Sequence, residues 1–561
     1  MPYKRKDPKE TDSYESKKLK VEKSEKVQKE FLSAVLHGKL DEVEKFLKLG
    51  TIDVEDKNNS EACTALHFAS RSGNIPIIKE LLKNGANIEA TQVGYSGQIP
   101  IHFAVTKGQR SLLHIEDPNR SSHLDVVKFL LQNGANLHTL AGKGDTILHI
   151  CEVPEVIEFL IESGVSTNAR NEFQETPIYD AIGKFGNIDK LRVLLKNGAK
   201  VNIENNEKMS PLFYAMKGNS PEDQKIEYVM ELLKHGANPN LTKYAPLQLA
   251  MEKSHFKIAK QLIQHGAKVN IRCKRNQTPL HIAAKNGQVE LVKDLLKNGA
   301  KVQARNDQKE TPLLLAVSTV DTSTAKLTGP LENHIQTVEE LIKHGANVNA
   351  IYENEISPIL EAVHVESPEL AMLLLDHGAN PNVKDILNCT PLHYAAEYKF
   401  VTLVEKLLKH GANPNAEESN RNYTPLHVAI DEEYYQSEQD MINIVLLLLK
   451  NGANPNSITK TGYTPLSQMI SSPKLASILL DHGANVNSDY DGSGLTPLHW
   501  WLHTIVAGFT QEQEEIVKIM VKNCKDIDFK IQFEGNTVLE SALEKECHNI
   551  VKMIILKQNV L

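Results

Sequence analysis

Short apolar stripes separated by polar turns recur along this chain at intervals of about 33 residues. The pattern is clearest over residues 277–304, QTPLHIAAKNGQVELVKDLLKNGAKVQA. Leu280, Ala283 and Ala284 fall three and four residues apart, which places them on one face of a helix. A second stripe follows over residues 289–296. The unit therefore predicts two short helices, each with a narrow apolar face.

The ends of these two helices are marked by residues with a physical reason to stand there. Thr278 can cap the first helix, and Pro279 suits its first position because proline has a fixed φ and needs no N–H partner. Gly299 ends the second helix by supplying a left-handed conformation. Fourteen such starts occur from residue 64 onward, and eleven carry proline: Pro100, Pro177, Pro211, Pro246, Pro279, Pro312, Pro358, Pro391, Pro425, Pro465 and Pro497. The closing glycine recurs at Gly85, Gly134, Gly164, Gly198, Gly236, Gly266, Gly299, Gly345, Gly378, Gly411, Gly452 and Gly483.

Length and composition agree with a repeat array. The chain has 561 residues, too many for one ordinary core, and its 41% hydrophobic and 24% charged content is that of folded protein. A two-helix unit of this size cannot bury its apolar stripe alone and is stabilised mainly against its neighbours. We therefore expect an all-α repeat solenoid of stacked helix-turn-helix units.

Several phrases of the repeat resemble those of the ankyrin repeat: TPLHIAA, TPLHYAA at 390–396, TPLHVAI at 424–430 and the recurring HGANPN. The resemblance covers residues 31–561 and implies about fifteen units joined by hairpin-like loops in a curved superhelix. In this family the concave face and the loop tips usually bind proteins. It also implies a structural role for Thr278, Pro279, Leu280, His281 and Gly299, with the histidine tying the loop backbone together.

The predicted domain organisation has two parts. Residues 1–30 form a charged, disordered leader with ten Lys or Arg and seven Asp or Glu, and residues 31–561 form the solenoid. Five units are longer than the rest, with insertions near 106–122, 217–225, 318–334, 431–441 and 503–514. Insertions at one position of a stack project from one face, so they form either a second binding edge or loops that are tolerated because they cost little.

Two tryptophans, Trp500 and Trp501, break the pattern near the end of the array. Trp501 takes the place of a small inner alanine. It indicates either a locally repacked repeat or a pocket for a partner.

No pattern in the chain indicates catalysis, a cofactor or a metal. The start-motif histidines stand one repeat or more apart: His67, His102, His149, His281, His393, His427 and His499. Stacked helices lie about 10 Å apart, too far for these histidines to share a metal. Phosphate loops, HExxH and GxSxG are missing, and the six cysteines include no CxxC pair. We expect no enzyme, no cofactor and a reducing, intracellular setting.

Partner contact is expected at the loop tips, where large or charged side chains have no core to fill. The candidates are Tyr95, Phe173, Tyr244, Arg272, Lys274, Arg275, Arg305, Tyr352, Tyr423, Tyr463 and Tyr490. The alternative is that the tip tyrosines are packed hairpin residues. In the leader, Lys4, Arg5, Lys6, Lys17, Lys18 and Lys20 resemble a bipartite nuclear import signal, which would dock to an import receptor. The alternative is a solvating charged tail.

Three functions fit these patterns: a protein-binding scaffold or adaptor, a nuclear regulator that masks or recruits transcription factors, and a substrate receptor of a ubiquitin ligase. One or more proteins are the expected partners. The net charge of −8 makes nucleic acid a poor partner, and no apolar run is long enough to span a membrane. We expect a monomer in the cytoplasm, the nucleus or both.

Overall fold

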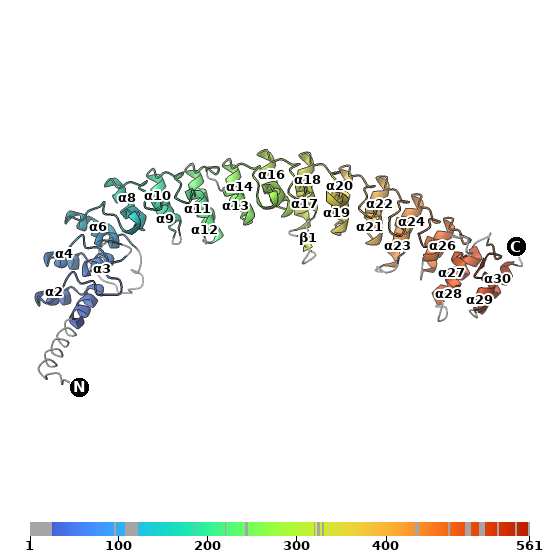
Figure 1. Cartoon of the computed structure of the whole chain (residues 1–561), viewed down its shortest axis with the longest axis horizontal. Helices are drawn as coiled ribbons and strands as arrows, with labels where there is room; N and C mark the ends of the chain where they lie inside the picture. Colours follow the sequence, from blue (N-terminus) through green and yellow to red (C-terminus); the bar gives the residue numbers. More distant parts are fainter. Residues whose placement is uncertain are drawn as a thin grey trace, which may run out of the picture. The chain divides into compact units, whose positions relative to one another are not determined.

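The computed structural model describes residues 25–94, 97–106, 122–183, 186–218, 220–241, 245–318, 320–321, 326–327, 330–431, 437–468, 472–488, 495–503, 511–523, 527–544 and 547–558. The chain divides into two compact units, Met1–Lys268 and Val269–Leu561. Both are stacks of helix pairs, so the predicted all-α repeat solenoid is confirmed. Within each repeat from α3 onward the first helix has an odd number and the second an even one (Figure 1).

The first unit opens with a helix over residues 25–36, so the predicted boundary between leader and solenoid falls inside a helix. Its second helices are α2 (Leu40–Lys48), α4 (Ile75–Lys83), α6 (His123–Gln132), α8 (Pro154–Glu162), α10 (Ile188–Lys196), α12 (Glu222–Lys234) and α14 (Phe256–Gln264). Its first helices are α3 (Ala65–Ser72), α5 (Pro100–Ala104), α7 (Ile147–Ile150), α9 (Pro177–Ile182), α11 (Pro211–Lys217) and α13 (Pro246–Glu252). A 3-10 turn, η1, spans Gly142–Gly144.

The second unit repeats the same order. Its first helices are α15 (Pro279–Lys285), α17 (Pro312–Val317), α19 (Pro358–His364), α21 (Pro391–Glu397), α23 (Pro425–Ile430), α25 (Pro465–Gln468), α27 (Pro497–His503) and α29 (Val538–Glu544). Its second helices are α16 (Val289–Lys297), α18 (Leu331–Lys343), α20 (Pro368–Asp376), α22 (Val401–Lys409), α24 (Glu438–Lys450), α26 (Pro473–Asp481), α28 (Gln511–Asn523) and α30 (His548–Gln558). The short pieces are η2 (Lys274–Asn276), η3 (Glu353–Glu355), and strands β1 (Val320–Asp321), β2 (Lys326–Leu327), β3 (Gln532–Phe533) and β4 (Asn536–Thr537), which pair as β1–β2 and β3–β4.

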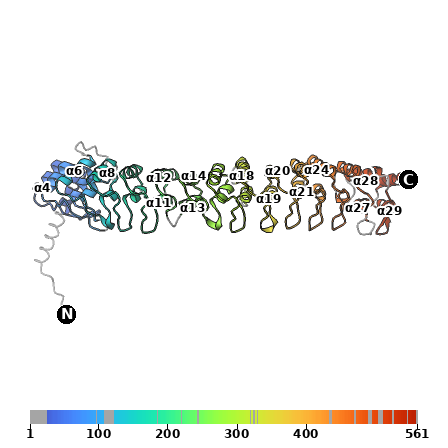
Figure 2. The ribbon, with the colours of Figure 1, turned by 90° about the horizontal axis from the view of Figure 1, so that it is seen from above.

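Neighbouring repeats bury each other's apolar faces. First helices pack on first helices, as α3 does on α5 and α15 on α17, and second helices pack on second helices, as α22 does on α24. The small inner alanines Ala283 and Ala284 are fully buried and allow this close approach. Within each unit, Figure 2 shows the connecting loops as a row of hairpins along one side.

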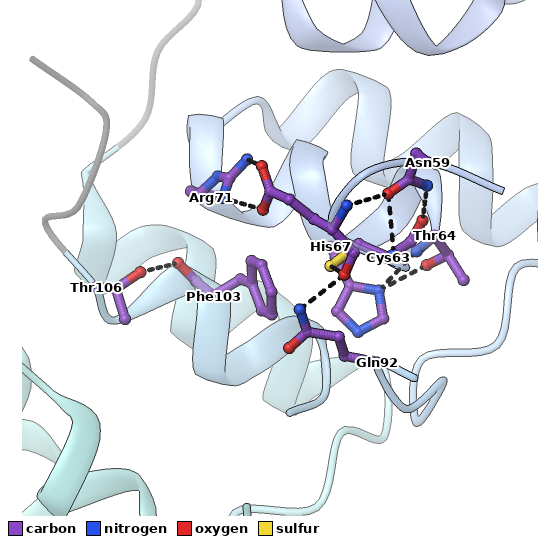
Figure 3. A network of polar contacts seen from close by, with 9 residues as sticks. Asn59, Cys63, Thr64, His67, Arg71, Gln92, Phe103 and Thr106 are labelled. Atoms are coloured by element: carbon purple, nitrogen blue, oxygen red, sulfur yellow. Dashed lines mark hydrogen bonds and ion pairs between the residues drawn. The ribbon is translucent and has the colours of Figure 1, made fainter. Parts of the chain in front are cut away.

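The start-motif histidine forms hydrogen bonds in two repeats. Nδ1 of His67 accepts from the Thr64 backbone N–H at 3.1 Å and lies 2.8 Å from Thr64 Oγ1 (Figure 3). Its Nε2 therefore carries the ring proton and lies 3.1 Å from Gln98 O, which is one repeat further along the chain. The same ring nitrogen reaches Thr139 O from His102, Glu175 O from His149, Glu310 O from His281 and Tyr423 O from His393, all at 3.1–3.2 Å.

This arrangement needs a neutral imidazole, because Nδ1 must accept while Nε2 donates. His67, His102 and His281 are at most 1% exposed. Burial lowers the pKa of each of these three histidines to about 4. The backbone carbonyl partner opposes that effect in each case but does not cancel it.

An asparagine ladder links the loops of successive repeats. The asparagine that ends the HGANPN-like phrase makes two bonds to the next repeat. Its Nδ2 donates to the oxygen of the closing glycine, and its Oδ1 accepts from the backbone N–H two residues beyond that glycine. Asn382, for example, donates to Gly411 O at 2.9 Å and accepts from Asn413 N at 2.7 Å. The other members with both bonds are Asn202, Asn240, Asn270, Asn349, Asn415 and Asn456. The ladder explains why this asparagine recurs.

The insertions are partly helical, which the sequence did not indicate. In four of the five long units the second helix has 13 residues, as in α12, α18, α24 and α28, against nine in α10, α16 or α22. Four extra residues are close to one helical turn. The residues between 107 and 121 lie outside the described part of the chain.

We expect the stability of the fold to fall as the pH drops from about 6.5 to about 4. In that range the unfolded histidines bind protons, whereas the buried ones do not, so protonation favours unfolding. A pKa lowered from 6.5 to about 4 corresponds to about 3 kcal/mol per histidine at most. Urea unfolding of wild type and His281→Gln across this range checks the expectation, since Gln248 occupies the same position in α13. An unchanged pH slope in the variant would contradict it.

Replacing Asn382 by alanine removes both ladder bonds between two repeats. We expect a loss of about 1 kcal/mol in the free energy of unfolding, because water replaces part of the lost bonding at this exposed site. Asn298→His is the matched control, since Asn298 and His265 both bond a carbonyl four residues back in their own helix. Urea titration that shows equal loss in both variants would refute a special role for the ladder.

Candidate protein-binding surfaces

Several hairpin tips share one geometry. In these tips an asparagine or acidic side chain accepts nearby backbone N–H groups, as Asn306 does from Gln308 N at 3.0 Å and Glu310 N at 2.9 Å. Between them stands a residue with positive φ, Lys309 at 60°. Other tips also place a residue in the left-handed region: Lys143, Gln174, Lys208, Arg275, Glu355, Asn388 and Asn422. A left-handed residue therefore recurs at the tips while its side chain varies.

Four of the predicted tip residues come together on two adjacent hairpins of the second unit. Arg272 donates through Nη1 to Asn276 O at 2.9 Å and to Arg305 O at 3.0 Å. Arg275 contributes its carbonyl to Asp307 N at 3.2 Å. Arg272, Lys274, Arg275 and Arg305 are all exposed, and we call these four residues the basic tip cluster. The guanidinium of Arg272 also stabilises the hairpins, a role that the sequence did not reveal.

Tyr352 is a correction to the predicted contact residues. Its side chain is 8% exposed and packs with Leu314 and Ala350. Its hydroxyl pairs with the buried Thr311 Oγ1. Tyr352 thus belongs to the core between two repeats, because the hydroxyl finds a partner there and the ring fills apolar space.

The other aromatic tip residues are partly packed. Phe173 is 45% exposed, with Lys143 Nζ 5.3 Å from the ring centroid. Tyr423 is half-buried beside His427, and Tyr463 is half-buried edge-on to Trp500 at 5.6 Å. Tyr95, Tyr244, Tyr490 and the leader residues Lys4, Arg5, Lys6, Lys17, Lys18 and Lys20 lie outside the described residues. These tip residues therefore remain predicted contact residues, and the described ones differ in how far their side chains are exposed.

A second binding surface besides the tips was expected from the sequence, but its residues were not named. We call one such surface the first-helix row. It is made by the fourth residue of each first helix, while the second, third, fifth and sixth residues of α15 are buried. In the first unit the half-buried or exposed members of the row are Ile150, Asp180, Tyr214 and Leu249. In the second unit they are Ile282, Glu361, Tyr394, Val428, Gln468, Trp500 and Ser541. The sequence could have indicated this row, because the residue at this one position of the repeat changes its chemical character from repeat to repeat.

One stretch of this row opens into a cavity of about 330 Å³ in the first unit. Its cause is a short helix: 18 residues separate Thr146 from Gly164, whereas 21 separate Thr278 from Gly299. Helix α7 therefore stops after Ile150, almost one turn early.

The missing turn of α7 leaves the carbonyl of His149 without its usual helical partner. The side chain of Lys190, from α10, replaces that partner and donates to His149 O at 2.6 Å. Lys190 is 3% exposed. At the same place in the other nine-residue second helices from α4 onward stands a buried apolar residue: Ile77, Val156, Ile258, Leu291, Leu370, Leu403 or Leu475. A lysine in that position marks a departure from the repeat pattern that the sequence alone could have shown.

Trp501 of α27, which stands where an inner alanine is expected, packs against the preceding repeat. It is 2% exposed, and its Nε1 donates to Leu466 O of α25 at 3.3 Å. In this repeat the result is a locally repacked core.

Carboxylates surround the cavity of the first unit. Asp145, Glu152, Glu175 and Asp180 all line it, together with Lys190. Asp180 is an exposed residue on the open side of the cavity, while its carboxyl has protein atoms close around it, with Lys190, Asp145 and Glu175 as charged neighbours. Burial raises the pKa of the Asp180 carboxyl to about 7, which Lys190 opposes and the neighbouring carboxylates reinforce. Burial also raises the pKa of Glu175 and lowers that of Lys190.

No helix among the described ranges is both long and apolar enough to cross a membrane. Within the same residues, no group of three or more His, Cys, Asp and Glu side chains is arranged to hold a metal ion.

Stacked helix pairs with constant packing positions and variable exposed ones define a helical-repeat protein of the interaction type. The family model described as "Ankyrin repeats (3 copies)" matches residues 31–121, 116–205, 184–273, 267–350, 325–418, 359–439 and 434–503. The chain belongs to the ankyrin repeat family. Ankyrin repeats are in general protein-interaction scaffolds and are typically non-catalytic.

Known proteins match only part of this chain. The Neurospora crassa "Ankyrin repeat protein nuc-2" is 23% identical over 256 residues, which are 45% of this chain and 22% of that protein. "Neurogenic locus notch homolog protein 1" of Xenopus tropicalis is 30% identical over 155 residues, 27% of this chain and 6% of that protein. The crystal structure of the human ASB11 ankyrin repeat domain is 27% identical, with a TM-score of 0.34, and covers 43% of this chain and 99% of that domain. The chain thus spans less than a quarter of the two relatives' length.

Replacing Lys190 by methionine removes the cation that opposes the rise in the Asp180 pKa. We expect the pKa of Asp180 to move further upward from about 7. Titration of ¹³C-labelled aspartate carboxyls by NMR checks this. Lys196→Met, on the exposed side of the same helix, is the control and should leave Asp180 unchanged. A downward or absent shift in Lys190→Met would contradict the proposed electrostatics.

Proposed function

We propose that this chain is a non-enzymatic scaffold that holds one or more partner proteins through the first-helix row and the hairpin tips. The observation that supports this most directly is that each repeat has separate packing positions and exposed positions. Residues that build the stack, such as Leu280 and His281, are buried. The fourth residue of the first helix and the outermost tip residue remain accessible in most repeats and change from acidic to aromatic to aliphatic along the chain.

Chemical variety on a constant frame suits recognition of a folded surface or an extended segment. The basic tip cluster adds a positive patch to an otherwise acidic chain with a net charge of −8. Such a patch favours an acidic surface on the partner and speeds encounter with it. We therefore place the main partner contact of the second unit at this cluster.

The nuclear regulator and the ubiquitin-ligase receptor remain alternative proposals. The first depends on the leader lysines Lys17, Lys18 and Lys20, which resemble half of an import signal. The second depends on a cullin-binding segment, which a pulldown can detect. No contact among the described residues favours one of them over a general scaffold.

Proximity labelling in cells with the full chain is the test of the scaffold proposal. The informative variant is K274A/R275N/R305A, in which asparagine tolerates the positive φ of 55° at position 275 and Arg272 is kept because it stabilises the hairpins. We expect the amount of labelled partner protein to fall at least about fivefold, because three cations of the proposed interface are removed.

The matched control is K293A/K297A/K301A, which removes the same charge from exposed lysines of the same two repeats. It should leave capture unchanged. Equal capture by wild type and K274A/R275N/R305A would refute the tip contact. A further arm, residues 25–561, keeps the described helix of residues 25–36 and tests whether the residues before it change the compartment of labelling.

A further inference from the structure

We infer that the cavity between α7, α9, α10 and α11 is a socket for a cationic side chain, arginine or lysine, presented by the partner protein. The inference rests on the proposed scaffold function and names what one part of the first-helix row recognises. The cavity exists because α7 ends a turn early, so it is a built feature of this repeat and not a gap between loops.

The volume suits such a side chain. About 330 Å³ is more than one arginine or lysine side chain occupies, and the cavity opens on the first-helix row, where Asp180 and Tyr214 stand in the fourth position of neighbouring helices. The Tyr214 ring lies edge-on to Tyr179, with centroids 5.2 Å apart. The wall therefore offers an aromatic surface to the aliphatic stem or the cationic head of the guest.

Among the described residues, the charges of the lining do not balance. Of these lining residues, Lys190 is the one basic side chain besides the neutral His149. Among the described residues, the single acceptor found for its ammonium is the His149 carbonyl at 2.6 Å, so the lysine serves the end of α7. In the described part of the chain, Asp145, Glu175 and Asp180 have no cationic group within 4.0 Å.

The contacts that these carboxylates do make come from neutral amides. Asp145 accepts from Asn171 Nδ2 at 2.9 Å, and Glu175 accepts from Asn205 Nδ2 at 3.0 Å. Each carboxylate keeps lone pairs for a further donor. Three carboxylates around one hollow repel each other, and a guest that brings one positive charge and several N–H donors relieves that repulsion.

Lys190 contributes to selectivity. It is 3% exposed, and its ammonium keeps two N–H donors beyond the bond to His149 O. Because Lys190 is buried whereas Asp180 is exposed, an acidic guest would meet a carboxylate first. A carbonyl oxygen of the bound segment is the group best suited to those remaining donors, so the socket fits a basic residue within a peptide chain better than a free cation.

The same repeat position elsewhere gives the matched control. Glu361 is the fourth residue of α19 and is half-buried, as a member of the first-helix row in the second unit. It does not line the cavity. E361Q therefore removes one negative charge from the row without touching the socket.

The test uses the full chain and four acetylated, amidated pentapeptides, AAXAA, in which X is arginine, lysine, norleucine or glutamate. Binding is followed by NMR of ¹³C-tyrosine-labelled protein, with Tyr214 as the reporter, and by calorimetry. We expect saturable binding of the arginine and lysine peptides, at least tenfold tighter than norleucine, and none of glutamate. E175Q/D180N should weaken arginine binding at least tenfold, and E361Q should leave it unchanged.

Equal binding of the arginine and norleucine peptides would overturn the inference, as would unchanged binding in E175Q/D180N that is still folded by circular dichroism. Failure here is separable from failure of the scaffold proposal. If partner capture in cells persists in E175Q/D180N and the peptides do not bind, the socket alone is refuted. If the peptides bind but K274A/R275N/R305A captures the full set, the tip contact alone is refuted.

Discussion

The buried imidazole of the start motif is the interaction on which the stack depends. One ring nitrogen accepts from the backbone that begins its own first helix, and the other donates to a carbonyl of the following repeat, as His281 does to Glu310 O at 3.1 Å. The bond pattern is available only to the neutral ring, which burial enforces. Each repeat that carries this histidine is thus tied to the next, and apolar stripes too narrow to form a core alone become one continuous core.

Where a first helix is shortened, this dependence on neighbours becomes visible. The truncated α7 leaves the His149 carbonyl in need of a donor, and the donor comes from the adjacent α10 as Lys190. The thin lysine side chain leaves a cavity whose lining is polar and acidic. A local deletion in one helix therefore changes what the neighbouring helix must supply.

The sequence predicted what depends on local chemistry. Helix pairs, caps and the all-α stack followed from residues such as Thr278, Pro279 and Gly299, because capping and left-handed turns act within a few residues. Features whose partner lies a repeat away were missed or wrong. Tyr352 was predicted to be an exposed tip residue. Its hydroxyl instead pairs in the core with Thr311, which lies 41 positions earlier in the chain. The ladder role of Asn382 was equally hidden, since Gly411 and Asn413 are distant in the chain.

The long units show how such an array can change in length without losing its packing. Each of α12, α18, α24 and α28 exceeds the ordinary nine residues by four, which rotates the added segment by little more than one full turn. The apolar face of the helix therefore keeps its phase against the neighbouring repeat. A second helix can therefore lengthen by a whole turn without disturbing its packing. An insertion of two residues would instead rotate the apolar face of the added segment towards solvent.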